Sequence, residues 1–298
     1  MIKKELKERF SYTKRTAIDW HVHTTASDGR LSPTELVREA KKAGLVEIAI
    51  TDHDAVSGIK EAKKAGKKLG VIIIPGIELT AYDGDIEAHV KGLNINPADK
   101  GILRLCRTAA EYRDKRAKII VQRLNSLGYN VSWKRVLELK TDVIGRGQII
   151  RAFMENENNL TLLKARYHIN HLPNGKDVIN YLISEGKPAY AKKAPLTIKE
   201  AIKAIHKAGG IAELSHPGGE KNITPEFSEK KIREYKDKGL DALEVYYGDH
   251  TLKQIKKYAK IAKSLDLIAT GGTDFHAIPE NKRKIGLGKI NLSKFWKK

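Results

Sequence analysis

Nine histidine, aspartate and glutamate residues stand at or near the ends of short segments that are rich in β-branched residues. They are His21, His23, Asp28, His53, Glu78, His89, His216, Asp274 and His276. His21 and His23 are separated by one residue, so on a strand both imidazoles face the same side while Val22 faces the other. The single cysteine, Cys106, cannot build a thiolate site alone. Any metal must therefore be held by imidazoles and carboxylates.

The composition of this set indicates what kind of metal centre it would form. Six imidazoles and three carboxylates suit zinc, manganese or iron, whereas calcium and magnesium prefer mostly oxygen ligands. One tetrahedral ion would use fewer than half of the nine residues, so two or three divalent ions are expected. Such a cluster attracts an anion and lowers the pKa of a bound water, which suits phosphoester hydrolysis by a metal-bound hydroxide held by the same nine residues.

The segments that carry these residues alternate with helical ones. Capping boxes that begin at Ser32 and at Thr197 mark the start of two of the helices. Seven strands in parallel order, joined by helices, favour a closed or nearly closed β/α barrel, in which strand carboxyl ends bring residues from different strands into one pocket. The predicted strands are AIDWHVH, EIAIT, VIIIPGIEL, IEAHVKGLNI, GIAELSH, ALEVYY and LIATGGTDFH.

The pattern changes near residue 97, where long, basic, helical sequence begins. Apolar residues at three- and four-residue spacing, such as Ala117, Ile120 and Leu124, are typical of a helix with one buried face. We therefore expect an N-terminal extension over residues 1–14, a discontinuous barrel domain over residues 15–96 and 190–298, and an inserted helical subdomain over residues 97–189.

The net charge of +20 would gather ligands that carry phosphate, although a Lys-rich solvated surface would give the same charge. The sequence has no apolar run long enough to span a membrane, and MIKKELKERF lacks the pattern of a signal peptide. These features predict a cytoplasmic protein that does not bind membranes. No protein partner is evident in the sequence.

The motifs HVHTTASDG, TDHD, PGIELT, SHPGG and GTDFH, in this order, resemble those of the PHP (polymerase and histidinol phosphatase) phosphoesterases. The resemblance covers residues 17–96 and 186–290, and it implies a distorted, TIM-like barrel of seven strands with three metal ions at the strand carboxyl ends. One ion would be held by His21, His23 and Asp274, and Glu78 would bridge it to a second. The second would also be held by His89 and His216, and the third by Asp28, His53 and His276.

The inserted helical segment is similar to that of the stand-alone branch of this family, which acts on nucleoside 3',5'-bisphosphates and on the 5' ends of short RNA. In that branch a Gly-Arg-Pro-His sequence supplies an arginine that binds substrate phosphate. The present chain has Gly145, Arg146, Gly147 and Gln148 there, so it keeps the arginine and lacks the proline and histidine. Arg146 is therefore expected to bind substrate phosphate, since a guanidinium matches two phosphate oxygens.

The expected activity is hydrolysis of phosphate monoesters or diesters of nucleotides or of short RNA, as in an exonuclease. Three alternatives stay open. A histidinol phosphatase would use the same barrel but would need no extended positive surface. Metal-dependent amide hydrolysis would normally include a lysine or carboxylated bridge at a strand end, and the sequence does not show one. A non-catalytic barrel that binds metal and RNA would explain the charge but would not need nine ligands.

Overall fold

The structure, a computed structural model, describes residues 17–139, 144–191, 196–219, 224–278 and 284–286. The predicted N-terminal extension, residues 1–14, lies outside these ranges. The described chain divides into two compact units, one drawn from Met1–Cys106 and Pro195–Lys298 and the other from Arg107–Ala194. The domain boundaries indicated by the sequence pattern stay a prediction.

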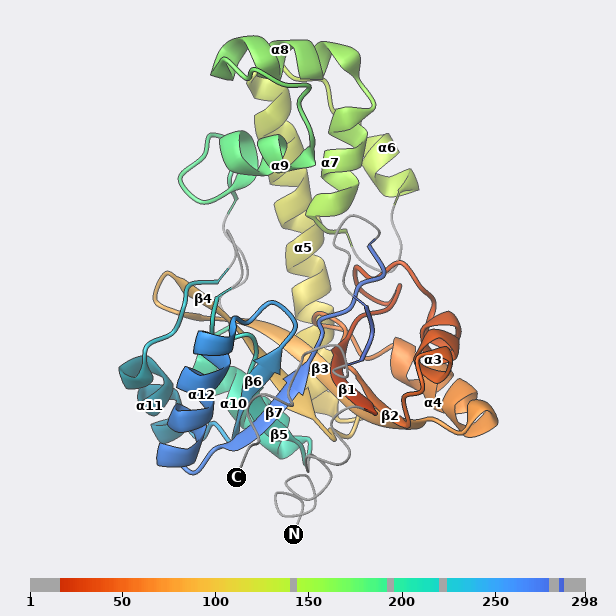
Figure 1. Ribbon diagram of the computed structural model, residues 1–298. Helices are drawn as coiled ribbons and strands as arrows, with labels where there is room; N and C mark the ends of the chain where they lie inside the picture. Colours follow the sequence, from red (N-terminus) through yellow and green to blue (C-terminus); the bar gives the residue numbers. More distant parts are fainter. Residues whose placement is uncertain (1–16, 140–143, 192–195, 220–223, 279–283, 287–298) are drawn as a thin grey trace. The chain divides into compact units, whose positions relative to one another are not determined.

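The first unit is built around a seven-stranded barrel whose strands lie side by side in chain order (Figure 1). A parallel bridge between Val22 and Phe275 brings the chain after the last strand beside the first. Buried Asp19 strengthens this seam by accepting hydrogen bonds from the backbone N–H and the hydroxyl of Thr273. The predicted seven-stranded β/α barrel is thus confirmed. Its strands are β1 Ile18–Val22, β2 Glu47–Ile50, β3 Ile72–Asp83, β4 Ile86–Leu93, β5 Ile211–Leu214, β6 Ala242–Tyr247 and β7 Ile268–Gly272.

The fourth strand runs against the predicted direction. β4 pairs antiparallel with both β3 and β5, whereas the other paired neighbours are parallel. β3 and β4 form a hairpin in which Asp83 is the register partner of Ile86, and Gly84 in the turn has φ +62°. The two-residue loop is Gly84-Asp85, and glycine at its first position is a hairpin signal, because glycine takes a positive φ at little cost. The expectation of seven parallel strands was therefore wrong at β4.

Helices cover the outside of the barrel, with α3 and α4 on one side of the strands and α10, α11 and α12 on the other (Figure 1). Ser32 and Thr197 cap α3 and α10 through capping boxes, as predicted. Core residues such as Trp20 and Leu243 are fully buried. The helices are α3 Pro33–Lys42, α4 Gly58–Leu69, α10 Ile198–Lys207, α11 Glu229–Asp237 and α12 Leu252–Ser264.

The second unit is helical throughout its described secondary structure. It has a hydrophobic core of its own, in which Phe153 and Leu163 are fully buried. Arg116 and Arg123 on the long helix α5 donate to the carbonyls of Ala191 and Tyr190 and so fasten the returning chain to this helix. The helices are α5 Lys100–Ser126, which begins within the range of the first unit, α6 Trp133–Glu138, α7 Arg146–Met154, α8 Glu157–Tyr167, α9 Gly175–Val178 and the π-helix Ile179–Ile183.

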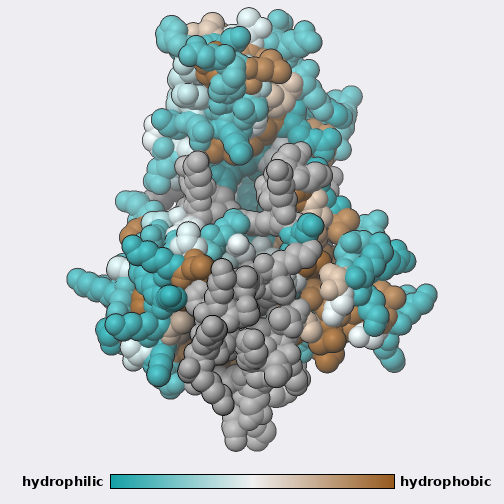
Figure 2. Space-filling model, viewed as in Figure 1, coloured by the Kyte–Doolittle hydropathy of each residue, from teal (hydrophilic) through white to brown (hydrophobic). Residues whose placement is uncertain are grey.

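The surface of the barrel helices is in keeping with the Lys-rich sequence. On the face drawn in Figure 2, hydrophilic residues predominate over α11 and α12. Among the described helices, none combines the length and the apolar character needed to cross a bilayer.

Candidate metal centre

The nine residues singled out in the sequence all lie in the first unit, and the structure brings them together. His21 belongs to β1, Glu78 to β3 and His89 to β4, while the other six follow the ends of β1, β2, β5 and β7. Each of the nine has a side-chain nitrogen or oxygen within 4.0 Å of another member. Residues separated by most of the chain therefore form one cluster.

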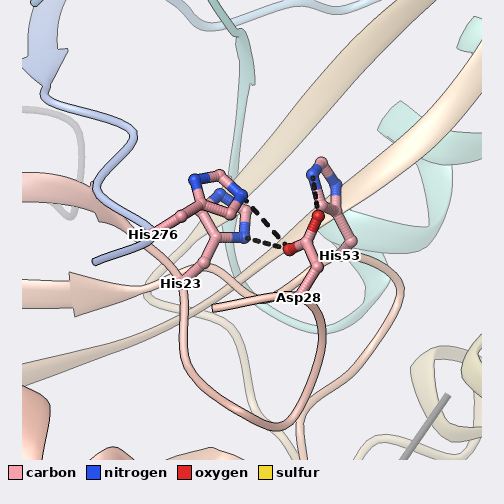
Figure 3. Close-up of side chains that lie close together, drawn as sticks. All are labelled: His23, Asp28, His53 and His276. Atoms are coloured by element: carbon pink, nitrogen blue, oxygen red, sulfur yellow. Dashed lines mark ion pairs between the residues drawn. The ribbon is translucent and has the colours of Figure 1, made fainter. Parts of the chain in front are cut away.

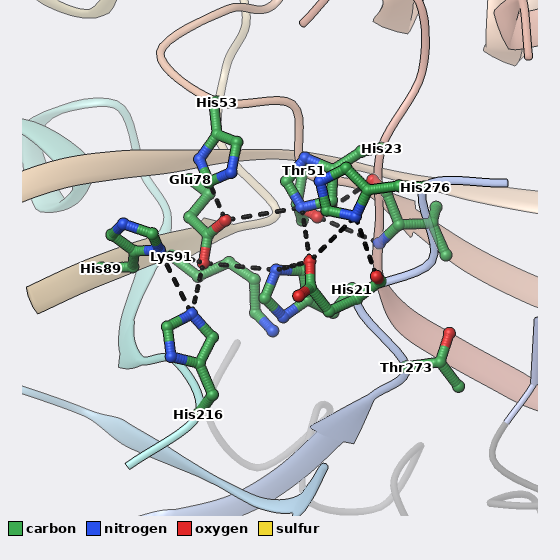
Figure 4. Close-up of polar contacts among 12 residues, drawn as sticks. His21, His23, Thr51, His53, Glu78, His89, Lys91, His216, Thr273 and His276 are labelled. Atoms are coloured by element: carbon green, nitrogen blue, oxygen red, sulfur yellow. Dashed lines mark hydrogen bonds and ion pairs between the residues drawn. The ribbon is translucent and has the colours of Figure 1, made fainter. Parts of the chain in front are cut away.

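Two carboxylates lie beside the imidazoles of His21, on β1, and of His23, just after it. Figure 4 shows one of them, Glu78, with both histidines. His21 Nε2 lies 3.2 Å from Glu78 Oε1 and 3.4 Å from Asp274 Oδ1. His23 Nε2 lies 3.1 Å from Asp274 Oδ1 and 3.4 Å from Glu78 Oε2. These four residues offer ligand atoms within 4.8 Å of one another, a spacing at which one metal ion could be held.

A second group contains His23, Asp28, His53 and His276 (Figure 3). Asp28 Oδ1 lies 3.2 Å from His276 Nε2, and Asp28 Oδ2 lies 4.0 Å from His53 Nε2. The side chain of Asp28 is 54% exposed, whereas that of His23 is fully buried. This group therefore borders the solvent.

Glu78 also belongs to a third group, with His53 and His89. Its Oε2 lies 3.2 Å from His53 Nδ1, and its Oε1 lies 3.6 Å from His89 Nδ1. His216 Nε2 lies 3.2 Å from His89 Nδ1 and 3.5 Å from Glu78 Oε1. Glu78 thus faces imidazoles on several sides, as a bridging carboxylate would.

The three groups overlap, because His23 and His53 each occur in two of them. His216 lies beside the third group without meeting its common spacing. The overlap means that geometry by itself does not divide the nine residues among separate ions. The division implied by the family resemblance stays a prediction.

Several buried atoms of the cluster make no hydrogen bond. They are His21 Nε2, both ring nitrogens of His23, His53 Nδ1 and both carboxylate oxygens of Glu78. A buried polar atom without a partner costs about 1–3 kcal/mol. Imidazole nitrogens and carboxylate oxygens are the donors that zinc, manganese and iron accept together, so these residues fit divalent metal ions.

The carboxylates of the cluster are held in their charged form. Burial raises the pKa of Glu78, but nearby imidazoles, His21 foremost, lower it more, so this pKa lies well below its usual range. At Asp274 burial is likewise outweighed by the attraction of His276, so its pKa also lies well below the usual range. The pKa of the partly exposed Asp28 lies well below its usual range too, because its partial desolvation is outweighed by the attraction of His276 and His53. The cluster therefore presents three negative charges to any cation.

The pKa values of the imidazoles in the cluster are shifted in two directions. Burial lowers the pKa of His89, but the charge of Glu78 raises it more, to about 10. His276 likewise has a pKa of about 10, because Asp28 outweighs burial. At His53 burial dominates and holds the pKa well below its usual value. Without metal, the cluster thus binds protons on some of the nitrogens that a metal ion would need.

The backbone adopts an uncommon conformation at two members of the cluster. His216 has φ +30° and Asp274 has φ +52°. Positive φ is rare for residues other than glycine and costs about 1–3 kcal/mol. The backbone N–H of His216 is fixed by a 2.7 Å hydrogen bond to Glu244 Oε2. Such strain is typical of functional sites, where the surrounding contacts hold the backbone in place.

Polar residues behind the cluster support it, and their role is not evident from the sequence alone. Glu244 Oε1 lies 2.9 Å from His21 Nδ1, and Lys91 Nζ donates to the same oxygen over 2.8 Å. The Tyr247 hydroxyl donates to Asp274 Oδ2 over 3.2 Å. The available signal was weak: Lys91 and Glu244 are charged residues inside otherwise apolar strand segments.

A second supporting contact orders the loop between His23 and Asp28. Buried Asp52 accepts hydrogen bonds from the backbone N–H and the hydroxyl of Thr24, at 2.7 and 2.8 Å, and from the hydroxyl of Ser27 at 2.7 Å. The chain from β2 therefore fixes the loop that carries Asp28.

Arg146 lies in the second unit, as the first residue of α7, and is partly exposed. The backbone N–H of Gly145 donates to Gln148 Oε1 over 2.9 Å, so Gln148 caps the start of this helix. A helix N-terminus attracts anions through its unpaired backbone N–H groups. The role of Arg146 in binding phosphate stays a prediction that this position supports.

Comparison with known proteins gives a consistent result. A protein-family model described as PHP domain matches residues 19–247. The chain is 32% identical to a 5'-3' exoribonuclease of Haemophilus influenzae, over 87% of this chain and 89% of that protein. It is 28% identical to a 3',5'-nucleoside bisphosphate phosphatase of Chromobacterium violaceum, over 90% of each chain.

Two solved structures share this fold. A Chromobacterium violaceum protein described as an amidohydrolase, with bound sulfate and no metal, has a TM-score of 0.76 at 27% identity, over 91% of this chain and 90% of that one. A Bifidobacterium adolescentis protein, predicted to be a metal-dependent phosphoesterase, has a TM-score of 0.73 at 28% identity, over 93% of this chain and 96% of that one.

Proposed function

Because the chain belongs to the PHP-domain family of metal-dependent phosphoesterases, we propose that it hydrolyses phosphate esters of nucleotides or short RNA at the nine-residue cluster. The observation that carries this proposal is Glu78, a fully buried carboxylate whose two oxygens make no hydrogen bond and face four imidazoles. These imidazoles belong to β1 and β4 or directly follow β2 and β5. Relatives named as an exoribonuclease and as a nucleoside bisphosphate phosphatase support this choice of substrate.

We propose that two or three divalent ions, drawn from manganese, zinc and iron, bind here. In this proposal His21, His23 and Asp274 hold the first ion, His89 and His216 hold the second with Glu78 shared between them, and Asp28, His53 and His276 hold the third. Ions bound in this way would neutralise the charge of the phosphoryl group and lower the pKa of a bound water.

The chain's own residues then bind and orient the substrate. Asp28 is the exposed member of the cluster, so the substrate phosphate would approach from its side. In the second unit, Arg146 at the N-terminus of α7 would bind substrate phosphate, since guanidinium and backbone N–H groups both favour anions.

Metal-dependent amide hydrolysis is less well supported. It would normally use a bridging lysine, and Lys91 is the lysine that lies nearest the cluster in sequence, on β4 beside His89. Its ammonium group lies 2.8 Å from Glu213 Oε1 and 2.8 Å from Glu244 Oε1. Lys91 is thus engaged by carboxylates behind the cluster.

The test is to strip the protein of metal and to assay it with and without added manganese. The substrates are adenosine 3',5'-bisphosphate, a short 5'-phosphorylated RNA and histidinol phosphate. We expect manganese-dependent release of phosphate or nucleotide from at least one of the first two. Turnover of histidinol phosphate alone would refute the choice of substrate. No turnover of any of the three substrates would refute the proposed activity.

A further inference from the structure

We propose that Glu244 is a positioning residue of the metal centre, which orients His21 and the backbone of His216, and that Lys91 holds its carboxylate in place. This inference rests on the proposed metal site and adds the residues that hold its ligands in place. Glu244 belongs to β6, and both it and Lys91 are fully buried.

Glu244 joins residues from three other parts of the barrel wall. Its Oε1 lies 2.9 Å from His21 Nδ1 on β1 and 2.8 Å from Lys91 Nζ on β4. Its Oε2 accepts the backbone N–H of His216, just after β5, over 2.7 Å. Figure 4 shows the Lys91 side chain reaching toward the ring of His21. One carboxylate therefore connects two of the nine residues of the cluster.

The contact with His21 determines which ring nitrogen is available to a metal ion. A carboxylate accepts hydrogen bonds, so His21 Nδ1 must carry the hydrogen. In the neutral ring, Nε2 then keeps its lone pair, and it points to Glu78 and Asp274 at 3.2 and 3.4 Å. Histidine ligands of metals commonly donate their second N–H to a carboxylate, which fixes both tautomer and orientation. Glu244 meets this description.

Lys91 makes it possible for Glu244 to stay charged in the barrel interior. Its ammonium group lies between Glu244 and Glu213, and Lys91 and Glu213 are direct partners in the pairing of β4 with β5. A buried carboxylate without a partner would be costly, and two facing each other would be worse. The three groups carry a net charge of −1, which a neighbouring cationic centre would offset.

The hydrogen bond to His216 extends the same effect to another part of the cluster. The positive φ of His216, +30°, places its ring with Nε2 3.2 Å from His89 Nδ1 and 3.5 Å from Glu78 Oε1. The bond from its backbone N–H to Glu244 helps to hold this conformation. Loss of Glu244 should therefore weaken metal binding at more than one position.

The experiment compares manganese affinity in the full-length wild type, Glu244→Gln and Glu213→Gln, by titration against a competing chelator. We expect Glu244→Gln to weaken binding about 10- to 100-fold. Glu213→Gln is the matched control, because it removes the same charge and also contacts Lys91 but touches none of the nine residues. Its affinity should stay close to that of the wild type. Saturating manganese should restore much of the turnover of Glu244→Gln.

A folding measurement and a second variant separate loss of metal binding from loss of the fold. Circular dichroism of the metal-free variants checks folding. Should Glu244→Gln fail to fold, Glu244→Asp keeps the charge but withdraws the carboxylate from His21, and it should also bind manganese more weakly. Equal losses in the Glu244→Gln and Glu213→Gln variants, or unchanged affinity in folded Glu244 variants, would overturn this inference. A wild type that binds no manganese would instead refute the metal centre itself.

Discussion

The imidazole rings of His23 and His276 are stacked, with centroids 4.1 Å apart and planes inclined by 13°. His23 follows β1 and His276 follows β7. This contact therefore requires that the first and last strands of the barrel lie side by side. The same holds for the group that these rings form with Asp28 and His53. The proposed metal centre therefore exists only in the closed barrel, and bound metal should stabilise that state.

Removing metal should lower the thermal midpoint of unfolding. Ions that bind only the folded protein stabilise it by an amount set by their concentration relative to Kd, about 2.7 kcal/mol at 100 times Kd for one site. Calorimetry of the stripped protein, with and without added manganese, measures this change. Magnesium at equal concentration is the control, since it prefers oxygen ligands. Identical midpoints with and without manganese would count against metal binding.

Replacing a central member of the cluster should abolish activity. In Asp274→Ala and His53→Ala we expect turnover to fall by roughly 10³-fold or more, because the proposed reaction depends on the assembled ions. The fold should be largely kept, since the barrel core does not include these side chains. Steady-state assays and circular dichroism check both points. Glu39→Ala, on the exposed face of α3, serves as the control, and full activity in the cluster variants would refute the assignment.

Arg146→Met should raise KM more than it lowers kcat. A charge-assisted hydrogen bond to phosphate contributes about 1.5–3 kcal/mol, which corresponds to a KM increase of about tenfold or more. The matched control is Arg151→Met, an exposed arginine on the same helix. Similar KM values in the two variants would show that Arg146 does not bind the substrate.

Metal binding should release protons near neutral pH. Burial lowers the pKa of His89 and His276, but their carboxylate neighbours raise it to about 10, above the ~6.5 of a free imidazole. A raised pKa means that these protonated rings stabilise the metal-free fold below about pH 6.5 and that this contribution is lost as the pH rises through about 10. Since a metal ion needs the neutral ring, apparent affinity should increase as the pH rises toward about 10.

The measurement is titration calorimetry in buffers with different ionisation enthalpies, from which the number of released protons follows. A binding enthalpy that is the same in every buffer would contradict the predicted release.

Asp19→Ala should destabilise the seam between β1 and β7. Its carboxylate accepts hydrogen bonds from the backbone N–H groups of His21, Thr273 and Gly286 and from the Thr273 hydroxyl. Each buried donor left without a partner costs about 1–3 kcal/mol, so the free energy of unfolding should fall by about 3 kcal/mol or more. Urea unfolding of the metal-free protein measures this loss. Thr273→Val, which removes only one of the four donors, should cost less, and a loss as large as that of Asp19→Ala would contradict the account.

The sequence was sufficient to predict the barrel and to indicate nine residues that lie close together in the structure, because both depend on local signals; their role as metal ligands stays a prediction. Ser32 and Thr197 cap helices through short-range contacts, and the spacing of His21 and His23 is a property of any strand. The direction of β4 also has a local signal, the two-residue loop Gly84-Asp85, which is typical of a hairpin and not of a parallel connection.

The supporting layer behind the cluster was not predictable in the same way. Glu244 meets His21 across 223 residues of sequence, and Asp52 orders a loop 25 and 28 residues before it. Such contacts depend on which strands become neighbours and on side-chain directions within the barrel. A charged residue in an apolar strand shows that a partner must exist, but it does not show which one.

The barrel is made from two stretches of chain, and this has a consequence for synthesis. β4 ends at Leu93, and β5, to which it pairs, begins only at Ile211. At about 10 residues per second, roughly ten seconds pass on the ribosome between the emergence of these two strands. During this interval the backbone groups of β4 that face β5, together with the apolar residues around them, lack their final cover. The second unit, which carries its own core and emerges in between, can fold first, so nascent chains halted before residue 211 should be the species most in need of a chaperone.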